Sequence, residues 1–149
     1  QFESEAAQIL EIFNHAILHT TALYEYKPRT MATMQQWFAN KSAGNFPVIG
    51  IKADDGTLLA FGSYGTFRAF PAFKYSVEHS VYVHSEHQGK GLGKQIMQAL
   101  MHYVQTQLPD SCYVNLIADG DAKYLYQQFG FADVAPESIG MGLTLPLTR

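Results

Sequence analysis

The chain has 149 residues, of which 47% are hydrophobic and 15% charged, with a formal net charge of −3. This length predicts one domain, 1–149, with enough apolar material for a proper core. No broad basic face is present, which argues against a nucleic-acid partner, and no apolar run approaches the roughly 18 residues of a membrane span.

The single cysteine, Cys112, excludes an internal disulfide and favours a reducing, cytoplasmic location. No signal-peptide pattern is present. Because the sequence begins at Gln1 without Met, we allow for a few residues ahead of it.

Hydrophobic spacing and turn residues divide the chain into alternating helices and strands. In chain order we predict a helix over 4–19, a helix over 30–40, strands over 47–53, 58–66 and 75–84, a helix over 91–108, a strand over 112–118, a short helix over 121–129, and strands over 130–134 and 142–147. The turn at Asp54-Asp55-Gly56-Thr57 is a strong hairpin signal. This order predicts an α/β (α+β) fold, a mixed sheet with helices on its faces.

The most informative segment runs from Val81 to Lys94 and predicts a strand, a short turn, a glycine-rich loop and a helix. Gly89, Gly91 and Gly93 alternate there, which suits positive φ or close approach of a ligand. Because a helix N-terminus follows at once, the arrangement is typical of a phosphate site. The alternative is a tight strand-to-helix turn with no ligand.

Counting along the loop excludes two common nucleotide motifs. The dinucleotide fingerprint G-x-G-x-x-G needs a glycine where Lys94 stands, and the triphosphate loop G-x-x-x-x-G-K-[ST] fails at Gln88 and Gln95. The remaining pattern, Q-x-G-x-G-x-G, resembles the coenzyme A pyrophosphate loop, Q/R-x-x-G-x-G/A, of the GNAT superfamily of N-acetyltransferases.

A second motif, about 30 residues later, is similar to another GNAT signature, N-x-x-S/A-x-x-L-Y-x-x-x-G-F. Asp119 stands where the family usually has Asn. The matching residues are Ala122, Leu125, Tyr126, Gly130 and Phe131. The plain reading of this segment is an amphipathic helix that stops at Gly130.

Most of the chain further resembles the phosphinothricin (methionine sulfoximine) acetyltransferase branch. The shared segments are Thr21-Ala22, Pro28-Arg29-Thr30, Trp37, Tyr64-Gly65, Arg68 and Val77-Glu78-His79-Ser80-Val81-Tyr82-Val83. The sequence departs from the branch at Phe70-Pro71-Ala72-Phe73, and Tyr126 replaces a residue that is often His. These departures concern the particular substrate rather than the reaction.

The resemblance implies a GNAT-like, mostly antiparallel sheet and acetyl-CoA as co-substrate, with direct transfer in a ternary complex. Backbone N–H groups around the loop would hold the pyrophosphate, and an N–H at or near Val83 would polarise the carbonyl. Lys90 and Lys94 add charge near the phosphates or are merely solvated. The expected cofactor-binding residues are Val81, Tyr82, Val83, Gln88, Gly89, Lys90, Gly91, Leu92, Gly93, Lys94 and Asp119.

Two side chains are candidates for proton transfer. Glu78, which shares a strand face with Ser80 and Tyr82, is the expected base, and burial would tune it for that role. The alternative is an ion-paired or solvent-facing glutamate. Tyr126 is the expected acid for the leaving thiolate, and its alternative is a packed helix tyrosine.

The substrate side of the site is less defined. The Arg68 guanidinium could bind a substrate carboxylate through two hydrogen bonds, and its alternative is a surface arginine with no such role. Phe67 and Tyr24 would line the pocket. Tyr26 and Trp37 would wall the same pocket, join the core or form a dimer contact.

Other reactive side chains are given no catalytic role. Cys112 has no evident base partner and is expected to be structural. His79, His84 and His87 lack a ligand-like spacing, so we predict no metal.

The sequence therefore predicts an acetyl-CoA-dependent N-acetyltransferase for a small amino acid-like amine. A homodimer without membrane or nucleic-acid partners is expected. The rivals are a protein N-terminal or lysine acetyltransferase, and a non-catalytic acyl-CoA sensor on the same fold.

Overall fold

The computed structural model describes residues 2–20, 22–23, 25–68, 70–71, 76–107, 113–118 and 120–136, with side chains for all of them except 2–4 and 113. The chain forms two compact units, Gln1–Ile117 and Ala118–Arg149, and each is considered by itself. None of the described helices is both long and apolar enough to cross a membrane.

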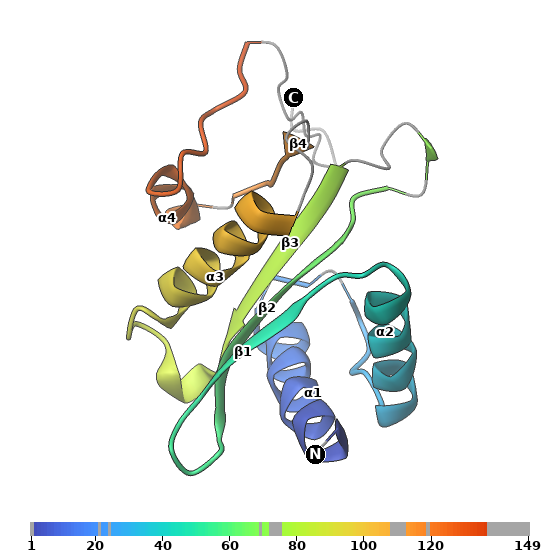
Figure 1. Ribbon diagram of the computed structural model, residues 1–149. Helices are drawn as coiled ribbons and strands as arrows, with labels where there is room; N and C mark the ends of the chain where they lie inside the picture. Colours follow the sequence, from blue (N-terminus) through green and yellow to red (C-terminus); the bar gives the residue numbers. More distant parts are fainter. Residues whose placement is uncertain are drawn as a thin grey trace, which may run out of the picture. The chain divides into compact units, whose positions relative to one another are not determined.

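The first unit contains a sheet with helices packed against it (Figure 1). Its elements are α1 (Phe2–His19), α2 (Met31–Ala43), β1 (Val48–Lys52), β2 (Leu58–Thr66), β3 (Ser76–Val83), a 3-10 turn η2 (Ser85–His87), α3 (Leu92–Gln107) and β4 (Tyr113–Val114).

The sheet has the order β1-β2-β3-β4. The first three strands pair antiparallel, whereas β3 and β4 pair parallel. The hairpin turn between β1 and β2 forms at the predicted place, with Gly56 at φ 88° and the Ala53 N–H donating to the Thr57 carbonyl. The mixed, mostly antiparallel sheet confirms the predicted fold class.

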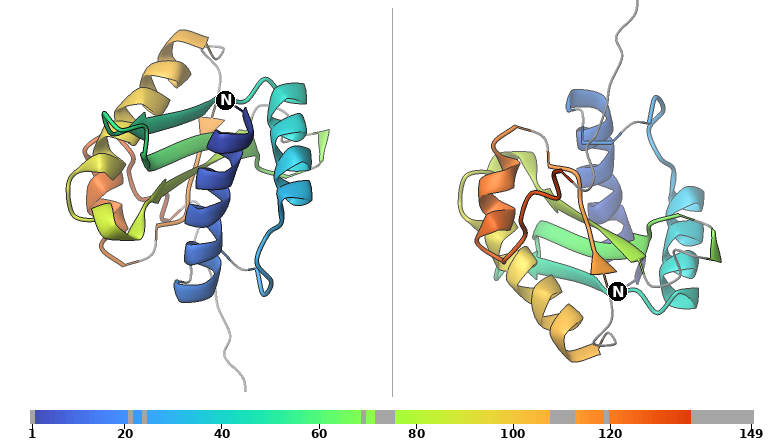
Figure 2. Two further views of the ribbon diagram at one scale, coloured as in Figure 1. Left: turned by 90° about the horizontal axis from the view of Figure 1, so that it is seen from below. Right: turned by 90° about the horizontal axis from the view of Figure 1, so that it is seen from above.

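Strand register assigns the two faces of the sheet to different helices. Phe61 pairs with Tyr82, and the Phe13 ring of α1 lies 5.0 Å from each of their rings. On the opposite face, a Cβ added to Gly62 would lie 2.4 Å from the Ile96 side chain of α3. Figure 2 shows the same layering, with α1 and α2 on one side of the strands and α3 on the other.

The main apolar cluster lies between α1, α2 and the sheet, because both helices direct their apolar stripes at it. Met34 of α2 is fully buried there, and Trp37 packs at its margin. The helix α2 begins with a capping box, in which Thr30 and Thr33 satisfy each other's backbone N–H groups. It continues to Ala43, three residues beyond the predicted end.

The second unit shows one short helix, α4 (Ala122–Gln127), followed by Gly130 at φ 86°. The strand predicted over 130–134 is absent from the described part of this unit, where 131–134 are irregular. In the first unit, the strand predicted over 112–118 is reduced to the two residues of β4. A strand exists only where its backbone pairs. The strand predicted over 142–147 lies outside the described residues.

Candidate active site

The glycine loop joins β3 to α3 as predicted. Gly89 and Gly91 have φ of 74° and 76°, a region that favours glycine. A Cβ at either position would meet nothing within 4 Å, so backbone conformation rather than packing requires glycine there. Gly93 has neither a positive φ nor a close neighbour, which leaves close approach of a ligand as a physical reason for it.

The N-terminus of α3 presents unpaired donors to this loop. The first amide that bonds within the helix is that of Gln95, which donates to the Gly91 carbonyl (3.2 Å). The amides of Leu92, Gly93 and Lys94 come before it, and Gly91 has no side chain that could cap them. The positive end of the helix dipole is therefore aimed at the loop.

Short hydrogen bonds fix the chain as it enters the loop. The His84 N–H donates to the Leu59 carbonyl of β2 (2.8 Å), and the His87 N–H donates to the His84 carbonyl (2.9 Å). The Glu86 N–H donates to His84 Nδ1 (3.3 Å), and Lys90 Nζ lies 3.1 Å from His87 Nδ1. Lys90 is thus directed at η2, while Lys94 is exposed.

Beside the loop, no strand in the described part of the chain pairs with one edge of β3 over its last residues. Pairing with β4 covers Ser76 and Val77. Since the amide of His84 points at β2, alternation directs the amides of Val83 and Val81 to the opposite edge. Among the described residues, these two amides therefore have no ladder bond to β4.

Tyr82, by contrast, is committed to the core. Its amide points at β2 by the same alternation, and its ring stacks on Phe61 with centroids 5.2 Å apart. Burial raises the pKa of Tyr82 to about 12. The predicted cofactor contact of this residue gains no support from its position.

Glu78 lies on the predicted face of β3, with Ser80 and Tyr82. Its side chain is exposed rather than buried, so its role as the base stays a prediction. Its cross-strand neighbour is Gly65, which has no side chain to cover it. Exposure allows a substrate to reach the carboxylate.

A cation that the sequence reasoning missed lies on the same face. Lys41, in the last turn of α2, donates a hydrogen bond from Nζ to the Tyr64 carbonyl of β2. Burial lowers its pKa, and the attraction of Glu78 opposes that shift. The available sequence signal was the placement of Lys41 four residues after Trp37, one turn along a helix.

The segment between α1 and α2 is held by a second polar group. Asn14 accepts from the Arg29 N–H (2.7 Å) and donates to the Arg29 carbonyl (3.1 Å). The Arg29 guanidinium pairs with Glu25 and lies 4.0 Å over the Phe13 ring. Its Nη1 is buried and has no hydrogen-bond partner among the described residues. The contacts with Asn14, Glu25 and Phe13 fix this segment.

The structure describes most, but not all, of the other residues predicted to bind the substrate. Arg68 is exposed, with its guanidinium 5.3 Å over the Phe67 ring. Trp37 packs against Phe13, and Tyr26 is fully exposed, so these two positions give no support for a pocket wall. Tyr24 lies outside the described residues and stays a prediction.

In the second unit, Tyr126 is half-buried on α4, and burial raises the pKa of its phenol. Its ring lies 6.0 Å from that of Phe131. A phenol that stays protonated suits the predicted role of acid. Asp119 and Cys112 lie outside the described residues, so their predicted roles stay predictions.

Metal-type side chains gather once within the described ranges, at His84, Glu86 and His87, whose ligand atoms lie within 4.8 Å of one another. His79 is not part of this group. His84 Nδ1 accepts the Glu86 N–H, whereas metal-bound histidines usually donate from their second nitrogen. The prediction that no metal is needed stays a prediction.

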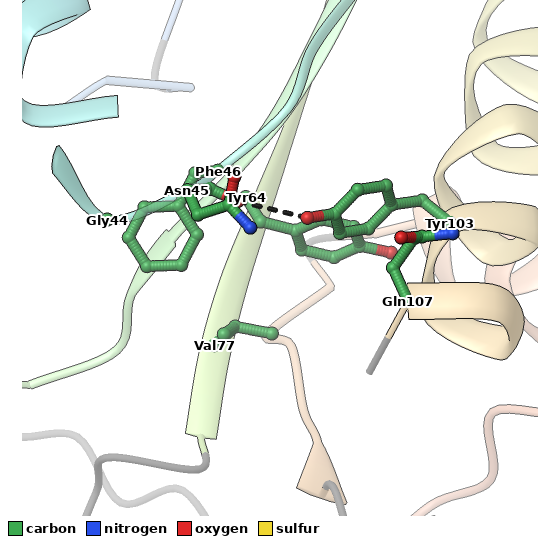
Figure 3. Close-up of a pocket in the computed structure, with 7 residues that line it drawn as sticks. All are labelled: Gly44, Asn45, Phe46, Tyr64, Val77, Tyr103 and Gln107. Atoms are coloured by element: carbon green, nitrogen blue, oxygen red, sulfur yellow. Dashed lines mark hydrogen bonds between the residues drawn. The ribbon is translucent and has the colours of Figure 1, made fainter. Parts of the chain in front are cut away.

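A cavity of about 120 Å³ lies on the α3 side of the sheet. Figure 3 shows it beside the hydrogen bond from the Tyr103 hydroxyl to the Asn45 carbonyl (2.9 Å). Its lining residues are Gly44, Asn45, Phe46, Tyr64, Val77, Tyr103 and Gln107. It is smaller than typical ligand pockets, and neither the glycine loop nor Glu78 lines it, so it is not the candidate site.

Comparison with known proteins agrees with this geometry. The model of the acetyltransferase (GNAT) family matches residues 9–131. An L-methionine sulfoximine/L-methionine sulfone acetyltransferase from Salmonella typhimurium is 37% identical over 99 residues, 66% of this chain and 57% of that protein. The L-amino acid N-acyltransferase MnaT from Escherichia coli is 31% identical over 134 residues, 89% of this chain and 77% of that protein.

Among solved structures, a Salmonella typhimurium protein with its cofactor acetyl-CoA has a TM-score of 0.75 at 31% identity, covering 89% of this chain and 76% of that one. The chain therefore belongs to the GNAT family of acetyltransferases, which confirms the predicted family. It spans little more than half the length of the methionine sulfoximine acetyltransferase.

Proposed function

We propose that the protein is an N-acetyltransferase that transfers the acetyl group of acetyl-CoA to the amine of a small amino acid-like molecule. Membership of the GNAT family and the names of the two relatives support this class of reaction. The observation that carries the proposal is the uncapped N-terminus of α3, preceded by two left-handed glycines. It is flanked by the edge of β3 to which no described strand pairs beyond Val77.

The coenzyme would supply an activated thioester, and the chain supplies the groups that hold it. The amides of Leu92, Gly93 and Lys94 fit a pyrophosphate, because they are unpaired donors at the positive end of a helix dipole. The Val83 amide, on the unpaired edge of β3, would donate to the acetyl carbonyl oxygen.

Glu78 would take the proton that the substrate ammonium must lose, directly or through one water. Its exposure on β3 makes it accessible to the amine. Tyr126 would return a proton to the departing thiolate, because its phenol carries the proton at neutral pH. The nitrogen–carbonyl bond forms as the carbon–sulfur bond breaks, within one complex and without an acyl-enzyme.

Arg68 and Phe67 are proposed to lie at the substrate end. We also propose that the enzyme is cytoplasmic, uses no metal and forms a homodimer. The single cysteine supports a reducing compartment, and the net charge of −3 argues against a nucleic-acid partner.

A thiol-release assay tests the proposal directly. The wild-type protein and acetyl-CoA are mixed with amino acids, methionine sulfone, methionine sulfoximine, phosphinothricin, polyamines and a peptide, and free coenzyme A is measured. Turnover with the amino acid analogues is expected. Turnover with the peptide alone would favour a protein acetyltransferase, and binding of acetyl-CoA without turnover on any amine would favour a sensor.

The Glu78→Gln variant tests the base. We expect the rate to fall about 10²-fold or more, most strongly at the acidic end of the working range, where less of the amine is already neutral. Because Glu78 is exposed and Gln has the same shape, the melting temperature should not change. A wild-type pH–rate profile would remove Glu78 as the base.

A further inference from the structure

The most unusual charge on the sheet is the ammonium of Lys41. It comes from the last turn of α2 and ends on the same face of the sheet as Glu78. A Cβ added to Gly65 would lie 3.1 Å from Lys41 Nζ. Since Gly65 is the cross-strand neighbour of Glu78, the ammonium is directly over the residue beside the proposed base.

Three contacts hold this ammonium in place. Nζ donates to the Tyr64 carbonyl and lies 5.2 Å from the centre of the Trp37 ring and 5.7 Å from that of Phe46. Aromatic faces attract a cation, and Lys is costly to bury without a partner. Stabilising the fold would not by itself require a charged side chain at this position. A half-buried, preorganised cation therefore indicates an additional role for Lys41.

Glu78 explains only in part why a charge is needed there. Its negative charge favours the ammonium form of Lys41, yet the described residues contain no ion pair between the two within 4.0 Å. An ammonium has three N–H donors, and in the described part of the chain one of them is used, on Tyr64. The Lys41 ammonium and the Glu78 carboxylate thus lie on the same face of the sheet without forming an ion pair in the described structure.

We propose that this gap receives the zwitterionic end of an amino acid, with Lys41 binding the α-carboxylate while Glu78 receives the proton of the α-amine. The proposal rests on the proposed acetyltransferase function and deepens it. The α-nitrogen and the carboxyl carbon are separated by two bonds, about 2.5 Å, so opposite charges side by side match the two ends of the molecule.

Lys41 suits this task better than the two nearby arginines do. Arg68 is exposed, and contacts between exposed charges contribute little. The Arg29 guanidinium is already paired with Glu25 and lies over the Phe13 ring, and its contacts hold the segment between α1 and α2. A carboxylate at Lys41 would also complete the hydrogen bonding of a partly desolvated ammonium.

The test compares two substrates that differ in one group, methionine sulfone and its carboxamide. In the Lys41→Met variant, which keeps the aliphatic packing on Trp37, we expect kcat/KM to fall about 10- to 100-fold for the acid and less than about threefold for the amide. Lys41→Arg should recover most of the loss, and Arg68→Met should discriminate less between the two substrates than Lys41→Met does.

Two further measurements keep the outcome decisive. Acetyl-CoA affinity and the melting temperature of Lys41→Met show whether the variant is folded. If it is not, Gly65→Ala shifts the ammonium by a few tenths of an ångström, and KM should rise for the acid alone. Equal losses on acid and amide would overturn the role of Lys41, whereas absence of turnover by the wild-type protein on every amine would overturn the proposed function itself.

Discussion

Replacing Gly91 with alanine tests whether the loop is shaped for the coenzyme. Gly91 has φ 76°, and an added Cβ would touch nothing within 4 Å. The only cost of the methyl group is therefore the left-handed backbone, about 1–2 kcal/mol for a residue other than glycine. An exposed loop can escape this cost in the free protein by relaxing to another conformation.

Binding would restore the left-handed conformation, so the cost would appear in the affinity. We expect acetyl-CoA to bind Gly91→Ala roughly 5- to 30-fold more weakly, since 1.4 kcal/mol corresponds to a factor of ten. Isothermal titration calorimetry measures this change, and denaturant unfolding measures the stability of the free protein, which should change little.

Gly56→Ala is the matched control. Gly56 also has a positive φ, 88°, with open space around its Cβ position, but it lies in the turn between β1 and β2. Its hydrogen bonds, with the Gly56 N–H donating to the Ala53 carbonyl (2.9 Å), keep the turn closed. We expect Gly56→Ala to lose about 1–2 kcal/mol of stability and to keep its affinity. If Gly91→Ala behaved in the same way, the reasoning that binding imposes the loop conformation would be refuted.

Three other substitutions follow from the packing and the pKa values. Because burial raises the pKa of Tyr82 to about 12 while an unfolded tyrosine ionises near 10, stability should fall by up to roughly 2–3 kcal/mol between pH 10 and 12. Tyr82→Phe should flatten that alkaline decline in denaturant midpoints, and an unchanged slope would contradict the assignment. Gly62→Ala would place a Cβ 2.4 Å from Ile96 and 3.0 Å from Leu100, so a loss of about 1–3 kcal/mol by overpacking is expected in thermal melts, and a wild-type melting temperature would argue against this contact. Tyr126→Phe should lower kcat at least about tenfold without weakening acetyl-CoA binding; an unaffected kcat would exclude it as the acid.

The parts of the fold that could be predicted depend on short-range chemistry. The strand over 58–66 and the turn at Gly56 were predicted at their observed positions, because alternation and turn residues act within a few residues of each other. The glycine loop was predicted for the same reason, since positive φ at Gly89 and Gly91 is a property of single residues.

The parts that could not be predicted depend on what packs against them. The sequence left open whether Glu78 is buried or faces solvent, because its exposure depends on Gly65, which only strand pairing brings beside it. The length of β4 is another case, because its pairing with β3 stops at Val77 although β3 continues to Val83, and no pattern in the sequence marks that point. The Tyr82 ring packs in the core because α1 lies against it, and the sequence of β3 gives no information about the position of α1.

The sequence by itself determined the order of the elements, the glycine loop with its two left-handed residues, and the side of β3 to which Glu78 belongs, because each of these is set by neighbours along the chain. The tertiary structure decided which charged side chains lie near each other. Lys41 lies over Gly65, beside Glu78, because the packing of α2 on the sheet carries its last turn there. Partial burial between aromatic rings then strengthens the attraction of that ammonium for an anion relative to a solvated lysine, since water screens it less.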